Sequence, residues 1–213
     1  MSNILDVPFV KNLKKWKGSG WCGPIALASI LRYYKDNSTV EKIADFSKAS
    51  KLGGGTIPEG LVYFCLVNNY NVDFFRSNRF AYKNYSKRYA SVLKNIKAKE
   101  LINEFNFKLL KSDKYNYIQK QPTLKEIKSY IDKKRPVLLY FNVAIIEGLN
   151  KIWPHYVVVV GYDKDYFYVH NIYPKNIKYQ QISKKLFEEA WKSDYLNDFL
   201  MIPYKPQKSV FHF

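Results

Sequence analysis

The stretch that decides the fold is PHYVVVVGYDKDYFYVHN, residues 154–171. Two runs of β-branched and aromatic residues flank the polar tripeptide Asp-Lys-Asp (163–165), and this composition predicts a β-hairpin. His155 begins the first strand and Asn171 ends the second, sixteen residues later. Residues on opposed strands share a face when the loop has an odd number of residues, and such neighbours have Cβ atoms ~4.5–8 Å apart. The three-residue loop is therefore expected to bring His155 and Asn171 together.

A helix precedes this hairpin and begins close to Cys22. The sequence WCGPIALASILRYY (21–34) places apolar residues at i, i+3, i+4 and i+7, which is the spacing of one helical face. Pro24 suits the first turn, where its missing N–H would have no partner in any case. Cys22 thus lies at the N-terminus of the helix, where the dipole and free N–H groups lower the pKa of a thiol. Gly23 follows directly, and we expect it to leave room for a substrate carbonyl.

The rest of the chain alternates between amphipathic and β-rich segments. Further helices are predicted from Ser38 with a capping box to Glu41, from Pro58 to about Asn69, from Thr123 with Glu126 as its partner, and at 183–193. Strands are predicted at 71–75, 137–143 and 198–203. Helices come first and an antiparallel sheet follows, which indicates the α+β class and a single domain over residues 1–213.

Residues 76–121 differ in composition and are interpreted as a basic, partly helical insertion. They hold twelve Lys and Arg against three acidic residues, so they carry more than half of the chain's net charge of +17. We expect this insertion to lie at a sheet edge or over the cleft, and to recruit an acidic substrate or partner. The alternative is a solvated lysine-rich surface without a partner. Only five of the 35 basic residues are arginine, so specific nucleic-acid recognition is not expected.

Composition excludes several classes of protein. The chain is 47% hydrophobic, which is enough for a packed core. Two cysteines and three scattered histidines provide no metal-site spacing, and no glycine motif for phosphate is present, so no metal or cofactor is expected. No apolar stretch reaches the length of a membrane span, and no secretory signal is visible. We therefore expect a cytoplasmic protein.

Three polar residues occupy positions that suit nucleophilic catalysis. Such chemistry needs a nucleophile, a base within reach and a group that fixes the tautomer of the base. Cys22 at a helix start fits the first role, His155 the second and Asn171 the third. The other candidates have ordinary interpretations: Cys65 is expected in the core, His170 on the opposite face of the hairpin, and His212 in the C-terminal tail.

The chain resembles the papain-like cysteine peptidases related to the bacteriocin double-glycine leader peptidases. The resemblance rests on the two segments quoted above and on RPVLLYFNV (135–143), VPFVKN (7–12) and GGGTIPEGL (53–61). It implies a papain-like fold, a catalytic set of Cys22, His155 and Asn171, and cleavage of a peptide substrate after small residues such as Gly-Gly.

Two positions depart from the pattern of that family. The family usually has Asp where this chain has Asn171, whose neutral amide orients an imidazole but cannot stabilise imidazolium as a charge does. The family's oxyanion hole uses a Gln side chain, and its counterpart here is Asn12, with Ser19 as the alternative. The same residues also fit an acyltransferase, in which an amine replaces water. A third possibility is a catalytically weak module that binds an acidic partner through its lysine-rich face.

Overall fold

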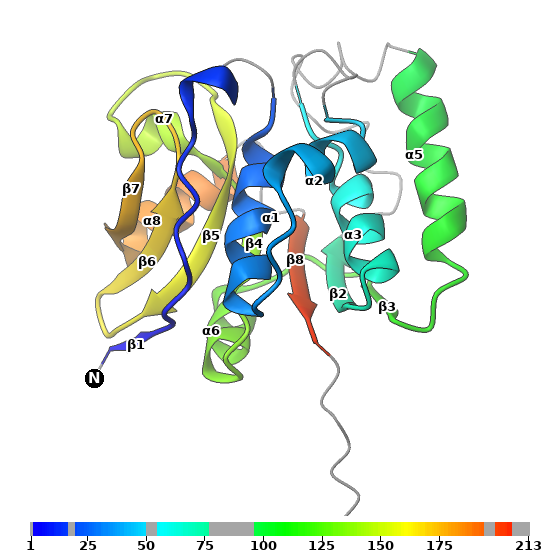
Figure 1. The fold of residues 1–213 in the computed structure, drawn as a ribbon. Coiled ribbons are helices and arrows are strands. Elements are labelled where there is room, and N and C mark those ends of the chain that lie inside the picture. Colours follow the sequence, from blue (N-terminus) through cyan, green and yellow to red (C-terminus); the bar gives the residue numbers. More distant parts are fainter. Residues whose placement is uncertain (1, 17–19, 50–54, 77–95, 194–198, 206–213) are drawn as a thin grey trace, which may run out of the picture.

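The computed structural model is organised around one β-sheet with helices on both faces (Figure 1). It describes residues 2–16, 20–49, 55–76, 96–193 and 199–205. The helices are α1 (Cys22–Tyr33), α2 (Val40–Phe46), α3 (Pro58–Val67), α5 (Ile96–Leu109), α6 (Leu124–Asp132), α7 (Val143–Ile146) and α8 (Lys184–Lys192), with a 3₁₀ turn at Lys14–Trp16. The strands are β1 (Asn3–Ile4), β2 (Asn71–Arg76), β3 (Tyr115–Ile118), β4 (Val137–Asn142), β5 (Pro154–Tyr162), β6 (Tyr166–Asn171), β7 (Ile177–Ser183) and β8 (Phe199–Tyr204).

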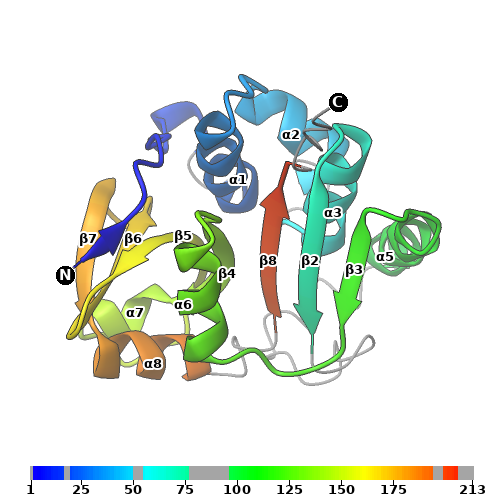
Figure 2. The same ribbon diagram turned by 90° about the horizontal axis from the view of Figure 1, so that it is seen from below.

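The sheet has the order β3-β2-β8-β4-β5-β6-β7, and β1 adds to β5. Helices α1 and α2 lie on one side of it, and α7 and α8 lie on the other (Figure 2). This arrangement confirms the α+β class. The sheet is mixed rather than wholly antiparallel, because β2 and β3 are parallel. A parallel pair needs a long crossover, and the chain between these strands includes α5.

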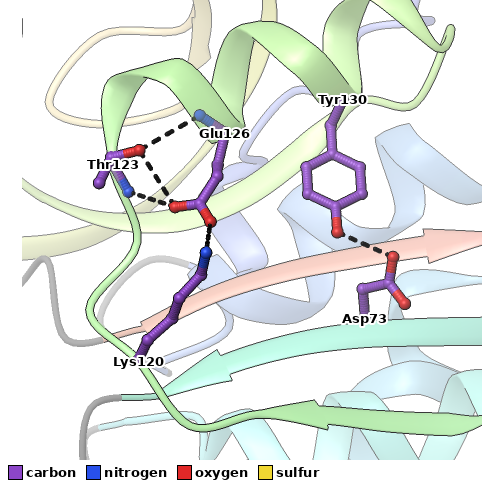
Figure 3. Close-up of polar contacts among 5 residues, drawn as sticks. All are labelled: Asp73, Lys120, Thr123, Glu126 and Tyr130. Atoms are coloured by element: carbon purple, nitrogen blue, oxygen red, sulfur yellow. Dashed lines mark hydrogen bonds and ion pairs between the residues drawn. The ribbon is translucent and has the colours of Figure 1, made fainter.

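Helix α6 shows how local sequence fixes an element and tertiary contacts place it (Figure 3). Thr123 accepts a hydrogen bond from the backbone N–H of Glu126, and the Glu126 carboxylate accepts one from the backbone N–H of Thr123. This is the predicted capping box, and Lys120 pairs with the same carboxylate. One turn further along, the Tyr130 hydroxyl donates to Asp73 of β2 at 2.9 Å. The helix is therefore anchored to the sheet by a buried polar contact.

The basic segment contributes structure at one edge of the sheet. Of residues 76–121, the described part contains α5 and β3, and β3 is the edge strand beside β2. Helix α5 packs on α3, where the rings of Phe105 and Tyr63 lie 5.9 Å apart. Residues 77–95, which hold Lys83, Lys87, Arg88 and Lys94, lie outside the described residues. The interpretation of 76–121 as an insertion stays a prediction.

The first helix begins at Cys22, which confirms the predicted place of this residue at the helix N-terminus, but the start of the second helix needs correction. The second is capped by Thr39, whose hydroxyl accepts a hydrogen bond from the N–H of Lys42. A single side-chain cap at Thr39 thus replaces the expected box from Ser38 to Glu41. In the described part of the chain, no helix has both the length and the apolar character needed to cross a membrane.

Candidate active site

Cys22 lies in the first turn of α1, partly exposed and packed against strand β5. Burial raises the pKa of its thiol above the ordinary value, and the backbone amides of Tyr156, Gly23 and Cys22 itself act in the opposite direction. The expected effect of the helix start is thus present, but desolvation outweighs it. The contact with Tyr156 is informative, because it places the sulfur against the residue that follows His155.

Gly23 is required by packing inside the protein. A Cβ atom at this position would lie 2.9 Å from Cβ and Cγ2 of Thr56, which is closer than real Cβ contacts come. The side chain of Thr56 donates a hydrogen bond to the carbonyl of Gly20 at 2.7 Å. The buried side of Gly23 therefore faces Thr56, and this contact is one reason for a glycine here. The expected room for a substrate carbonyl stays a prediction.

His155 is the second residue of β5 and is 7% exposed. Burial lowers the pKa of its imidazole to about 3, so the ring is neutral near pH 7. Among the described residues, its Nε2 atom is buried without a hydrogen-bond partner. The ring lies 5.1 Å from that of Tyr173, which in turn lies 4.4 Å from the ring of Trp153. The histidine therefore sits in an aromatic setting with one ring nitrogen unsatisfied.

His155 and Asn171 share a face of the hairpin, but not for the predicted reason. Near the turn, Tyr162 pairs with Phe167, and the backbone N–H of Asp163 donates to the carbonyl of Tyr166. Continued without a break, this even register would place Asn171 on the face opposite His155. The register shifts at a bulge between Val159 and Gly161, after which Val158 pairs with His170. Continuing that register places Asn171 across from Val157, one step diagonally from His155.

The Asn171 side chain already has two partners. Its Nδ2 donates to Oε1 of Gln180 at 2.9 Å, and its Oδ1 accepts the backbone N–H of Tyr173 at 3.1 Å. The residue is 1% exposed, so both contacts are protected from water. Among the hydrogen bonds of the described residues, none joins Asn171 to His155. The predicted role of Asn171 therefore depends on the second lone pair of Oδ1.

Asn12 is held at the same end of the hairpin by its main chain. Its backbone N–H donates to Oδ1 of Asn176 at 2.6 Å, and its carbonyl accepts from Nδ2 of Asn176 at 3.1 Å. The side-chain oxygen of Asn12 is buried without a hydrogen-bond partner in the described part of the protein. The backbone is thus fixed, while the side-chain amide is not committed. Ser19, the alternative oxyanion donor, lies outside the described residues.

Two residues that the sequence assigned to ordinary roles, Cys65 and His170, lie where they were expected. Cys65 is fully buried in the core, and burial raises the pKa of its thiol well above the usual value. His170 points away from His155, with Nε2 2.8 Å from the carbonyl of Val7 and Nδ1 accepting the N–H of Tyr179. His212 lies outside the described residues. Within the described chain, no group of three or more His, Cys, Asp or Glu side chains is arranged to hold a metal.

Sequence reasoning missed Thr56 and Gly161, two residues that shape the site. Thr56 gives no catalytic signal, because its importance comes from contacts with distant residues. Gly161 does give a signal, since a glycine within a strand pattern often marks a bulge or a close backbone approach. A Cβ at Gly161 would lie 2.6 Å from the carbonyl oxygen of Asn3, so this position also lets β1 pair with β5.

A cysteine at the start of a helix that packs against a strand with a histidine near its beginning, in an α+β fold, is the arrangement of the papain-like class of cysteine peptidases. The model of the Peptidase_C39 like family matches residues 4–195. The chain therefore belongs to this family, and this membership supports a cysteine peptidase. No curated protein matches the sequence.

Several solved structures share the fold. The C39-like peptidase from Bacillus anthracis is 14% identical with a TM-score of 0.56, covering 96% of this chain and 98% of its own. The peptidase domain of Streptococcus ComA, a bifunctional ABC transporter of a quorum-sensing pathway, is 16% identical with a TM-score of 0.55, covering 92% and 97%. The double-glycine motif protease of an AMS/PCAT transporter, solved in complex with the leader peptide, is 14% identical with a TM-score of 0.51, covering 95% and 94%. At these identities, the likeness concerns the fold.

Proposed function

We propose that this chain is a cysteine peptidase in which Cys22 is the nucleophile, His155 the general base and acid, and Asn171 the group that orients the imidazole. The observation that carries the proposal is the packing of α1, which begins at Cys22, against β5, which carries His155. It brings the thiol at the start of α1 beside the strand of His155, where the backbone amide of Tyr156 lowers the pKa of the thiol. Membership of the C39-like family supports the same chemistry.

The pKa values of the two groups determine how the reaction begins. Burial raises the pKa of the Cys22 thiol and lowers that of the His155 imidazole, so both groups are neutral in the free protein near pH 7. Attack on a peptide carbonyl then requires the thiol proton to pass to His155 as the carbon–sulfur bond forms. Oδ1 of Asn171 accepts the other ring N–H through its second lone pair and holds the tautomer that this transfer requires.

The remaining steps follow from the same groups. Negative charge on the carbonyl oxygen is stabilised by the backbone N–H of Cys22 and by the amide of Asn12. The carbon–nitrogen bond breaks, and His155 gives its proton to the departing amine, which leaves an acyl thioester on Cys22. Water then attacks the thioester while His155 accepts a proton from it. The thiolate leaves, regains a proton from the imidazolium, and the carboxylic acid product is released.

The substrate that we propose is a peptide cleaved after small residues. The transporter protease with a similar fold was solved with a leader peptide, and peptides are the substrates that the resemblance to double-glycine leader peptidases implies. An acidic peptide would also be attracted by the net charge of +17. Exposed charges act mainly on association and are screened beyond ~8–10 Å at physiological salt, so the attraction should weaken as salt is added.

The test is cleavage of a mixed peptide library followed by mass spectrometry of the products. We expect the wild type to cleave a subset of peptides, Cys22→Ala to cleave none, and Cys65→Ala to behave as the wild type. The last variant is a matched control, because it removes the other thiol from the core. Glycinamide added to the reaction distinguishes hydrolysis from acyl transfer by the mass of the new C-terminus. Cleavage by Cys22→Ala, or no cleavage by the wild type, would overturn the proposal.

A further inference from the structure

Thr56 lies between the two halves of the proposed site and is 2% exposed. On one side, its hydroxyl donates to the carbonyl of Gly20, two residues before Cys22. Its Cβ and Cγ2 also occupy the space beside Gly23, the residue after Cys22. The segment that carries the proposed nucleophile is thus held by Thr56 both before and after the cysteine.

On the other side, Thr56 is held by the sheet. The hydroxyls of Tyr140 and Tyr156 both donate to its backbone carbonyl at 3.1 Å. These tyrosines pair across β4 and β5, and their rings lie 4.1 Å apart. Tyr156 directly follows His155. The strand that bears the proposed base is therefore connected, through one buried carbonyl, to the residue that holds the helix start.

We infer that Thr56 is a positioning residue that sets the distance and orientation between Cys22 and His155, an inference that rests on the proposed function. Two hydroxyls on one carbonyl satisfy both of its lone pairs, so the backbone of Thr56 is fixed relative to β5. The threonine side chain then transmits this position to Gly20 and Gly23. A displacement of about 1 Å between reacting groups costs about 10²-fold in rate, so this single buried residue can control turnover without contacting substrate.

The side chain of Thr56 offers a nearly isosteric test. Thr56→Val removes the hydroxyl that holds Gly20 and keeps the volume beside Gly23, whereas Thr56→Ser keeps the hydroxyl. We expect Thr56→Val to lower kcat by about 10²-fold with a small change in KM, and Thr56→Ser to remain within a few-fold of the wild type. Ser47→Ala is the matched control, because Ser47 is also a buried hydroxyl donor to a backbone carbonyl, that of Ile43, in a different part of the fold.

A second measurement reports on Cys22 without any peptide. The rate of alkylation of Cys22 by iodoacetamide between pH 6 and 10 measures its thiolate fraction. Loss of the Gly20 contact should move the sulfur away from the amide of Tyr156 that favours the thiolate. Thr56→Val is therefore expected to shift the alkylation profile to higher pH, and Ser47→Ala to leave it unchanged. This measurement remains informative even if the wild type cleaves no peptide, a result that would overturn only the proposed function.

The outcomes separate positioning from general stability. Equal thermal stability of Thr56→Val and Ser47→Ala, with a loss of kcat and a shifted alkylation profile only in the former, would support the inference. Wild-type turnover and alkylation in Thr56→Val would overturn it, as would an equal loss in Thr56→Ser. If Thr56→Val does not fold, Tyr156→Phe tests the same connection from the strand. That variant should slow turnover and shift the alkylation profile in the same direction, and unchanged values would overturn the inference.

Discussion

His155 and His170 lie on neighbouring strands of one hairpin, yet their surroundings are opposite. His170 has a partner at each ring nitrogen: Nε2 donates to the carbonyl of Val7, and Nδ1 accepts the N–H of Tyr179. These contacts fix one neutral tautomer. His155 is also buried, but among the described residues its Nε2 has no partner. Both ring nitrogens of His170 are thus hydrogen-bonded within the fold, whereas Nε2 of His155 remains available.

This difference has an energetic meaning. Buried polar atoms are nearly always hydrogen-bonded, and each exception costs stability that the rest of the fold must offset. The structure satisfies His170 with backbone groups of the N-terminal segment and of β7, so this residue stabilises the packing of three segments. His155 contributes no such contact. A buried residue whose ring nitrogen has no partner, and which costs stability, is the better candidate for chemistry.

The comparison is tested most severely by removing each ring. His155→Ala should lower peptide cleavage by at least ~10⁴-fold, because the proton of the thiol then has no acceptor, and its melting temperature should change little. His170→Ala should retain measurable turnover but unfold at a lower temperature, since the Val7 carbonyl and the Tyr179 N–H lose their partner. Turnover and differential scanning calorimetry of both variants would check this. Activity in His155→Ala would remove the histidine from the mechanism.

A smaller effect is expected at Asn12, which follows the segment that His170 holds. Asn12→Ala should slow acylation by about 10²-fold, the usual cost of losing one oxyanion donor. The hydrogen bonds between Asn12 and Asn176 are made by the backbone of Asn12 and should survive this change. Asn12→Asp is the control, because it keeps the size but removes the donor, and it should be equally slow. A normal acylation rate in both variants would transfer the role to Ser19 or to backbone N–H groups alone.

Much of the fold could be predicted because local signals and burial agree. The capping box at Thr123, the buried strand β4 and the hairpin were all readable from residue type and period. Strand β7 was not, because IKYQQIS has a single fully buried residue, Ile182, and lacks the alternation of a half-buried strand. The mixed sheet was missed because β3 lies within a lysine-rich segment whose charge hides four strand residues, Tyr115–Ile118.

The members of the candidate site were proposed from the sequence and stay a prediction, whereas the geometry could not be predicted. Cys22, His155 and Asn171 stand out by residue type and position. The bulge near Gly161 decides which face Asn171 occupies, and an even turn plus a bulge gives the same parity as an odd loop. The thiol pKa was misjudged because a helix start is visible in sequence, whereas the desolvation that outweighs it depends on how β5 packs against Cys22.

Asn171 is next to both histidines: it directly follows His170 in β6, and it lies diagonally across from His155 of β5. Asn171→Ala should reduce turnover by roughly 5-fold, because it removes the proposed hydrogen bond to the His155 ring, whose net worth is about 1 kcal/mol. Substrate binding should change less than turnover. Asn171→Asp should be tolerated, as a carboxylate accepts the same N–H and stabilises the imidazolium. Steady-state kinetics would separate kcat from KM, and a folded but inactive Asn171→Asp would contradict the orienting role.

The smallest expected effect is on stability against pH, and it involves both histidines. Burial lowers the pKa of His155 to about 3 and that of His170 to about 4, where Lys178 also lowers the value while the Val7 carbonyl and Asp6 raise it. An unfolded histidine titrates near 6.5, so the unfolded chain binds more protons between pH 6.5 and these values. The contribution of the two histidines to the free energy of unfolding is therefore fully present above about pH 6.5. It is lost progressively as the pH drops below that value.

Each buried histidine contributes up to ~1.4 kcal/mol per pH unit to this slope. Urea unfolding at pH 7, 6 and 5 would measure it, since most carboxylates remain ionised in that range. His155→Ala and His170→Ala should each remove about one histidine's share of the slope, even though only the second variant loses hydrogen bonds. A slope unchanged in His155→Ala would mean that the imidazole of His155 titrates in the native protein as it does in the unfolded chain. The ring would then be partly protonated near pH 6, which would contradict a reaction that begins from a neutral thiol and a neutral imidazole.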